Sequence, residues 1–147
     1  MKSLFLTLFL TLLLTLSSFA SDSSLDLEVK ILEKIISEIF INKEKIIWSD
    51  NKELCTAIRK KELIKTTPEC KKATIMVLKD IKNLSKECAN SVIFVLDYEL
   101  LSKVPKSFGA FFWKKGRPNV VILKSRLNSL SIQASNDLDP YLEDKVW

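Results

Sequence analysis

The chain reads ATIMVL at residues 73–78 and SVIFVL at residues 91–96. Both runs are almost continuous in apolar residues, which is typical of strands that are buried on both faces of a sheet. Such strands belong mainly to parallel sheets that helices cover on both sides. These two segments therefore indicate an α/β fold and give the centre of its sheet.

Helical and strand patterns alternate on both sides of these two strands. The hydrophobic periodicity predicts helices at residues 25–41, 52–61, 98–103 and 124–130, and strands at residues 45–48, 63–66, 107–113 and 119–123. Asp50 or Asn51 is expected to cap the second helix. The last two strands flank a turn that contains Gly116 and Pro118. We expect residues 136–147 to form a polar tail, with a last turn at residues 140–142. The sequence thus predicts a single α/β domain, with a mostly parallel sheet flanked by helices and a C-terminal antiparallel hairpin.

The N-terminus has the pattern of a cleavable signal peptide. Lys2 precedes an apolar run of about 13 residues, which is shorter than the roughly 20 residues that a membrane-spanning helix needs. Small residues at the −3 and −1 positions suit a cut after Ala20. We therefore predict residues 1–20 as a signal peptide, residues 21–147 as the mature domain and a location outside the cytoplasm. An uncleaved anchor is the alternative, because no charged residue occurs between Lys2 and Ala20.

The composition excludes several classes of enzyme and binding protein. The chain contains no histidine, which excludes Ser-His-Asp and Cys-His nucleophile systems and histidine-ligated zinc. Its two glycines argue against a glycine-rich phosphate-binding loop. Removal of the leader lowers the formal net charge from +5 to +4, and the charges are scattered, so we expect no nucleic-acid partner. We predict no metal or other cofactor, and the composition leaves carboxylate-only chemistry open.

The three cysteines allow three pairings in an oxidising compartment, each of which leaves one thiol free. Cys70 and Cys88 each precede one of the two central strands, and this favours a disulfide between them at the same end of the sheet. Cys55 falls within a helical pattern and would then be a buried free thiol. The alternative is that all three remain reduced as small core residues.

A cluster of cations beside a tryptophan marks the hairpin turn. The cluster comprises Trp113, Lys114, Lys115 and Arg117. One interpretation is a partner-binding surface, because tryptophan and arginine are common hot-spot residues. The other is a solvated turn with Trp113 packed inward. Strand alternation places Phe111 and Trp113 on one face and Phe112 on the other, which suggests that both faces are covered and favours this second interpretation.

Two carboxylates, Asp80 and Asp97, follow the two central strands. Because ligands of open parallel sheets bind outside the carboxyl ends of the strands, these residues could line a small cleft. The alternative is that each carboxylate caps the segment after it, with Asp97 capping a helix that begins at Tyr98. The capping role is the more ordinary one for an aspartate in this position.

Most of the chain carries a recognisable order of elements, of which the C-terminal part is the most distinctive. The run FGAFFWKKGRPNVVIL at residues 108–123 leads from a glycine-led strand through a turn to a second strand, and Arg126 and Leu127 follow in a short helix. A strand that carries Trp48 and a cysteine, Cys70, just before a buried strand complete the pattern. This order resembles that of small exported proteins of the YfiR/HmsC-like family, over residues from about 25 to 135.

The resemblance implies a periplasmic α/β domain without catalytic activity, whose partner is an inner-membrane signalling protein. Members of the family bind the periplasmic face of an inner-membrane diguanylate cyclase and restrain it, so a role in cyclic-di-GMP signalling is implied. Association as a homodimer is left open. Two other classes are alternatives: a periplasmic small-molecule-binding domain, and a structural envelope protein or histidine-independent hydrolase.

Overall fold

The structure is a computed structural model that describes residues 23–62, 64–88 and 91–147. The predicted signal peptide, residues 1–20, lies outside these residues. Within them, no helix combines the length and the apolarity that a membrane span requires.

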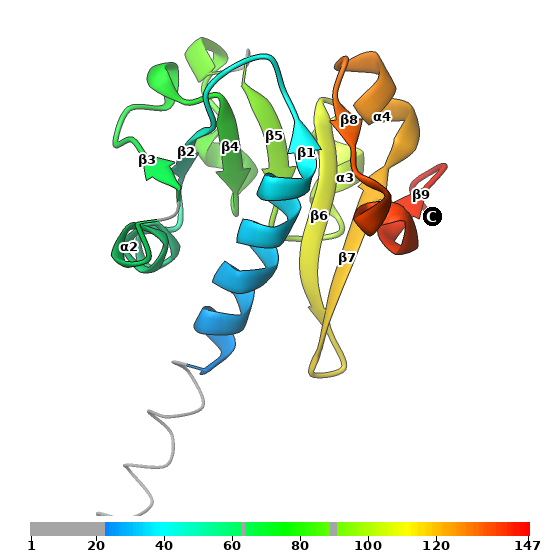
Figure 1. Ribbon diagram of the computed structural model, residues 1–147, viewed down its shortest axis with the longest axis horizontal. Coiled ribbons are helices and arrows are strands. Elements are labelled where there is room, and N and C mark those ends of the chain that lie inside the picture. The colour runs from blue at the N-terminus through cyan, green and yellow to red at the C-terminus, as the bar shows by residue number, and fades with distance from the viewer. Residues whose placement is uncertain (1–22, 63, 89–90) are drawn as a thin grey trace, which may run out of the picture.

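A mixed sheet forms the centre of the domain (Figure 1). In spatial order its strands are β3 (Lys65–Thr66), β2 (Ile46–Ser49), β4 (Ile75–Leu78), β5 (Val92–Val95), β6 (Ser107–Lys114), β7 (Arg117–Leu123) and β9 (Leu142–Glu143). Strands β3 to β6 run parallel to one another, β7 runs antiparallel to β6, and β9 runs parallel to β7. The structure therefore confirms the predicted α/β class, the mostly parallel sheet and the C-terminal hairpin.

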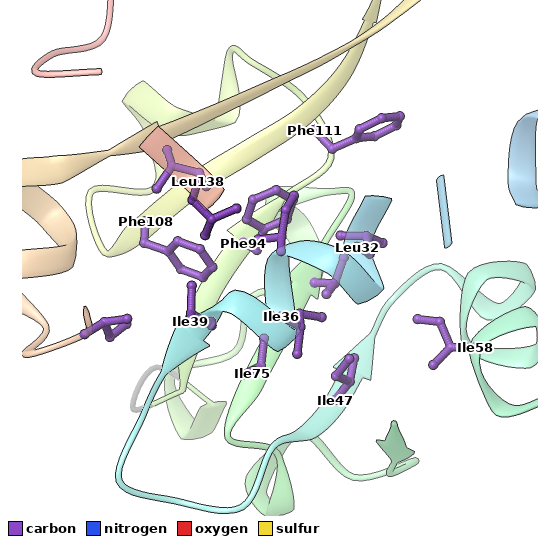
Figure 2. Close-up of a cluster of buried hydrophobic side chains, with 14 of the residues drawn as sticks. Leu32, Ile36, Ile39, Ile47, Ile58, Ile75, Phe94, Phe108, Phe111 and Leu138 are labelled. Atoms are coloured by element: carbon purple, nitrogen blue, oxygen red, sulfur yellow. The ribbon is translucent and has the colours of Figure 1, made fainter. Parts of the chain in front are cut away.

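Helices and short turns cover both faces of the sheet. An N-terminal helix, residues 23–38, and α2 (Lys52–Lys60) pack on one face, where their apolar side chains meet strand residues such as Ile75 (Figure 2). On the other face, α3 (Leu100–Lys103) and the turns before β5 pack over residues such as Met76. All of β4 is buried between these two layers, as its continuous apolar sequence predicts.

The N-terminal helix ends three residues earlier than predicted. The helical pattern was expected to continue to residue 41, but Ile39–Phe40 form β1, which pairs antiparallel with β8 (Gln133–Ala134) in a separate two-stranded sheet. Ile39 would be buried in a continued helix and is buried in β1, so the hydrophobic periodicity does not distinguish the two. Phe40, predicted on the apolar face of the helix, is 55% exposed.

The C-terminal tail is part of the fold. After α4 (Lys124–Ser129), a 3₁₀ segment, η4 (Asn136–Tyr141), buries Leu138 completely, and β9 extends the sheet beside β7. The prediction of a polar tail is therefore wrong, although the turn expected at residues 140–142 overlaps the end of η4. Leu138, Leu142 and Val146 provide its apolar contacts, and they are too few and too widely spaced to mark a helix or strand by their periodicity.

Arg126 of α4 joins three elements at the start of β6. Its Nη1 donates to the carbonyl oxygens of Val104 and Ser107, at 3.2 and 2.9 Å, and to the Ser107 Oγ at 3.1 Å. Its Nη2 donates to the carbonyl oxygen of Leu101 at 2.8 Å. Burial lowers the pKa of this guanidinium. Arg126 thus caps the carboxyl end of α3 and holds the beginning of β6 in place.

Candidate functional site

The hairpin of β6 and β7 extends beyond the sheet. β5 pairs with β6 only as far as Ala110, and β9 pairs only with the last two residues of β7, so no described strand flanks residues 111–121. Lys115 and Gly116 close the hairpin with φ angles of 51° and 72°, the left-handed backbone that tight two-residue turns require. We call residues 113–118 the hairpin tip; Figure 1 shows it at the far end of β6 and β7.

The aromatic residues of β6 alternate between the two faces of the hairpin, as predicted. Phe111 is buried, and Trp113 lies edge-on to it with ring centres 5.7 Å apart. Phe112 packs instead against Tyr98, with ring centres 5.1 Å apart. Trp113 is nevertheless 43% exposed, because the hairpin extends beyond the layers that bury Phe111. The interpretation that Trp113 packs inward is therefore wrong, and its indole is available for contact.

The cations of the hairpin tip project into solvent. Lys114, Lys115 and Arg117 are exposed, and none forms an ion pair with another described residue. On the outer edge of β7, Pro118 has no N–H to donate, which disfavours the addition of a further strand. Contacts of the tip must therefore come mainly from its side chains, one indole and three cations around a single turn.

Asp80 caps the turn that follows β4, as one of the two interpretations predicts. Its carboxylate accepts a hydrogen bond from the Lys82 amide at 2.9 Å. A second carboxylate, Asp50, holds the same loop from the end of β2. Its two oxygens accept hydrogen bonds from the amides of Lys79 and Asp80, at 2.7 and 2.8 Å, and from Asn83 Nδ2 at 2.9 Å. Asp80 and Asp50 therefore both accept hydrogen bonds from backbone amides of the loop at this edge of the sheet.

Asp97 also holds the turn that follows its strand. Its carboxylate accepts a hydrogen bond from the Glu99 amide at 2.9 Å. The next helix begins at Leu100 and not at Tyr98, so Asp97 stabilises a turn before the helix and does not cap it. Asp97 lines a hollow of about 400 Å³ beside Trp113, and Asp80 is not part of that lining. The structure thus gives the two predicted carboxylates separate surroundings.

A crevice of about 740 Å³ lies at the carboxyl ends of β2 and β4. Trp48 and Asp50 line it from the end of β2, and Asn83 lines it from the loop after β4. α2 adds two cations, Lys52 and Arg59, which are seven residues apart and so lie on one side of the helix. These residues form no motif in the sequence, so the sequence alone does not predict the crevice. The one usable signal is the position of Lys52 just after a strand and its helix cap.

The structure pairs Cys70 with Cys88, with Cα atoms 5.5 Å apart, and so confirms the predicted disulfide. The bond joins η1 (Cys70–Lys72) to η3 (Lys86–Cys88), which precede β4 and β5, and it is compatible with an oxidising compartment. Cys55 is free, but half-buried where full burial was expected. Its thiol donates to the Ser49 carbonyl oxygen at 3.6 Å, and desolvation raises its pKa.

Comparison of the chain with protein-family models, with curated proteins and with solved structures finds no match. The resemblance to the YfiR/HmsC-like family therefore stays a prediction from the sequence. Among the described residues, no group of three or more acidic or cysteine side chains is placed to hold a metal ion. What the chain does must be inferred from the geometry of the hairpin tip and the crevice.

Proposed function

We propose that the chain is a non-catalytic regulatory module of the periplasm that binds a protein partner through its hairpin tip. The observation that carries this proposal is the exposure of Trp113 at a hairpin end that also presents Lys114, Lys115 and Arg117. Tryptophan and arginine are enriched among the residues that contribute most to interface affinity. By resemblance to the YfiR/HmsC-like family, the partner is the periplasmic part of an inner-membrane diguanylate cyclase, which the bound module restrains.

The surroundings of Trp113 suit a protein interface. The hollow beside it includes the apolar side chains of Leu96 and Phe112, which offer room for an apolar side chain of the partner. The tip is also pre-formed, since the Trp113 ring packs edge-on against Phe111 and Asn119 Nδ2 donates to the Arg117 carbonyl oxygen at 2.9 Å. A pre-formed surface loses little conformational entropy on binding. The three cations, which form no ion pair within the described residues, would steer an acidic partner surface toward the indole.

The proposal places the mature domain in the periplasm after removal of residues 1–20. The Cys70–Cys88 bond supports this location, because disulfides persist in oxidising compartments. Mass spectrometry of the N-terminal peptide of the protein recovered from the cell envelope tests the processing. We expect Ser21 as the first residue, whereas a peptide that begins within the leader would show that the segment is retained.

Affinity capture from detergent-solubilised host membranes tests the partner. We expect the tagged wild-type chain to retain an inner-membrane diguanylate cyclase, and Trp113→Ala to retain at least about tenfold less of it. The combined change of Lys114, Lys115 and Arg117 to Gln should act in the same direction. Trp147→Ala is the matched control, because Trp147 is 78% exposed but lies outside the tip. Equal capture by the Trp113 and Trp147 variants, or capture of no cyclase, would overturn the proposal.

A further inference from the structure

The loops after β2 and β4 leave the sheet on opposite faces. β2 leads into α2, whose apolar residues join the same cluster as the N-terminal helix, and the chain then enters β3 on one side of β2. β4 leads into η2 (Ile81–Asn83) and η3, where Cys88 joins the cluster of the other face, and the chain then enters β5 on the opposite side. Diverging loops of adjacent parallel strands open a crevice at the carboxyl ends of the strands, which is where open α/β sheets bind ligands.

The crevice at this point, about 740 Å³, is large enough for a small organic molecule. α2 presents two different stripes: Leu54 and Ile58 are buried in the core, whereas the stripe that begins at Lys52 lines the crevice. The other members of the lining stripe are Cys55, Thr56 and Arg59. Trp48 and Pro68 contribute apolar surface to the same space. The crevice therefore combines an apolar wall with a polar helix face.

The charges that line the crevice do not cancel. Asp50 is the carboxylate of this lining, and both of its oxygens already accept hydrogen bonds from the loop after β4. Lys52 has no ion-pair partner among the described residues, and Arg59 donates through Nε to the Thr66 Oγ1 at 3.3 Å. The terminal nitrogens of Arg59 have no hydrogen-bond or ion-pair partner in the described part of the chain, so they can meet a ligand. The lining therefore has a net positive charge, because Lys52 and Arg59 face only Asp50, whose oxygens are already hydrogen-bonded. This favours a negatively charged ligand.

We propose that this crevice binds a small organic anion, a carboxylate or phosphate ester that carries an apolar body. Lys52 and Arg59 are about 10 Å apart along the helix axis, within the combined reach of their side chains, so both can converge on one anionic group. The apolar body lies against Trp48 and Pro68. The site shares no residue with the hairpin tip and does not depend on the partner proposed for it.

Fluorescence titration of the purified chain with 8-anilinonaphthalene-1-sulfonate, an anion with an apolar body, tests the site. We expect Lys52→Gln and Arg59→Gln each to weaken binding about tenfold, because each removes one charge-assisted hydrogen bond. Lys60→Gln removes the same charge from the same helix outside the crevice and should leave binding unchanged. Equal weakening in all three variants, no weakening in any of them, or no binding by the wild type would overturn the proposal.

Cys55 reports where the probe binds, because it is free and lines the crevice. Saturating 8-anilinonaphthalene-1-sulfonate should slow the alkylation of Cys55 by iodoacetamide in the wild type and not in Arg59→Gln; equal rates with and without the probe would contradict the site.

Unfolding midpoints that match the wild type show that the variants are folded. Displacement of the probe by hexanoate or by hexyl phosphate assigns the carboxylate or the phosphate class, and displacement by neither contradicts the proposal.

Discussion

The two ends of β6 differ in chemistry although one strand connects them. At the hairpin base, residues 107–110, every residue is buried, and the guanidinium of Arg126 pairs with backbone oxygens around Ser107. At the hairpin tip, Trp113 is 43% exposed and the neighbouring cations have no carboxylate partner among the described residues. Polar groups that are buried must be paired, whereas exposed charges contribute little to folding. The base therefore stabilises the fold, and the tip is left free for binding.

Replacement of Arg126 by Met should break the hairpin base. The carbonyl oxygens of Leu101, Val104 and Ser107 lose the hydrogen bonds that Arg126 donates, although Val104 keeps those from the amide and hydroxyl of Ser107. We therefore expect the free energy of unfolding to fall by about 3 kcal/mol. Arg117→Met removes the same charge at the tip and should change the free energy of unfolding by less than about 0.5 kcal/mol. Chemical denaturation measures both variants, and equal losses would contradict the division between base and tip.

The two glycines of the chain lie one in the hairpin base and one in the hairpin tip, and they should differ in their effect on stability. A Cβ at Gly109, in the base, would lie 2.6 Å from the Val121 carbonyl oxygen and 3.0 Å from a ring carbon of Phe94. We expect Gly109→Ala to destabilise the protein by roughly 1–3 kcal/mol, because the backbone of β7 must shift. Gly116→Ala, in the tip, meets no atom within 4 Å and should cost only about 1 kcal/mol, through its positive φ. Thermal unfolding ranks the two variants, and a larger loss at Gly116 would argue against a tightly packed base.

The smallest effect on stability is expected at Trp113. Because its side chain is half-exposed and meets Phe111 edge-on, Trp113→Ala should lower the free energy of unfolding by less than about 1 kcal/mol. The same variant should lose most of its partner capture. Chemical denaturation and affinity capture of one protein preparation measure both quantities. A loss of stability as large as that of Arg126→Met would show that Trp113 stabilises the fold as a core residue does, and would contradict this prediction.

Local sequence patterns predict the centre of this fold. β4 and β5 follow from their apolar runs, the hairpin turn from Gly116, and the disulfide from the positions of Cys70 and Cys88. β1, β8 and β9 are different, because each has two residues and pairs with a segment that is distant or itself short. No local periodicity can mark such strands, since tertiary packing alone holds them in place.

The candidate site is predictable only in part. The cations and the indole of the hairpin tip are visible as a cluster in the sequence, but the exposure of Trp113 depends on where β5 and β9 stop pairing. The crevice depends on the opposite directions of the loops after β2 and β4, which sequence order does not reveal. Lys52 and Arg59 therefore look like ordinary surface cations until the sheet topology is known.

Photo-crosslinking in intact cells tests the role of the hairpin tip most directly. A photoreactive phenylalanine analogue replaces Trp113 in one variant and the more exposed Trp147 in the control. We predict a covalent adduct between position 113 and the periplasmic part of an inner-membrane diguanylate cyclase, with little or none from position 147. Equal yields from the two positions, or no adduct with an inner-membrane protein at position 113, would contradict binding through the tip.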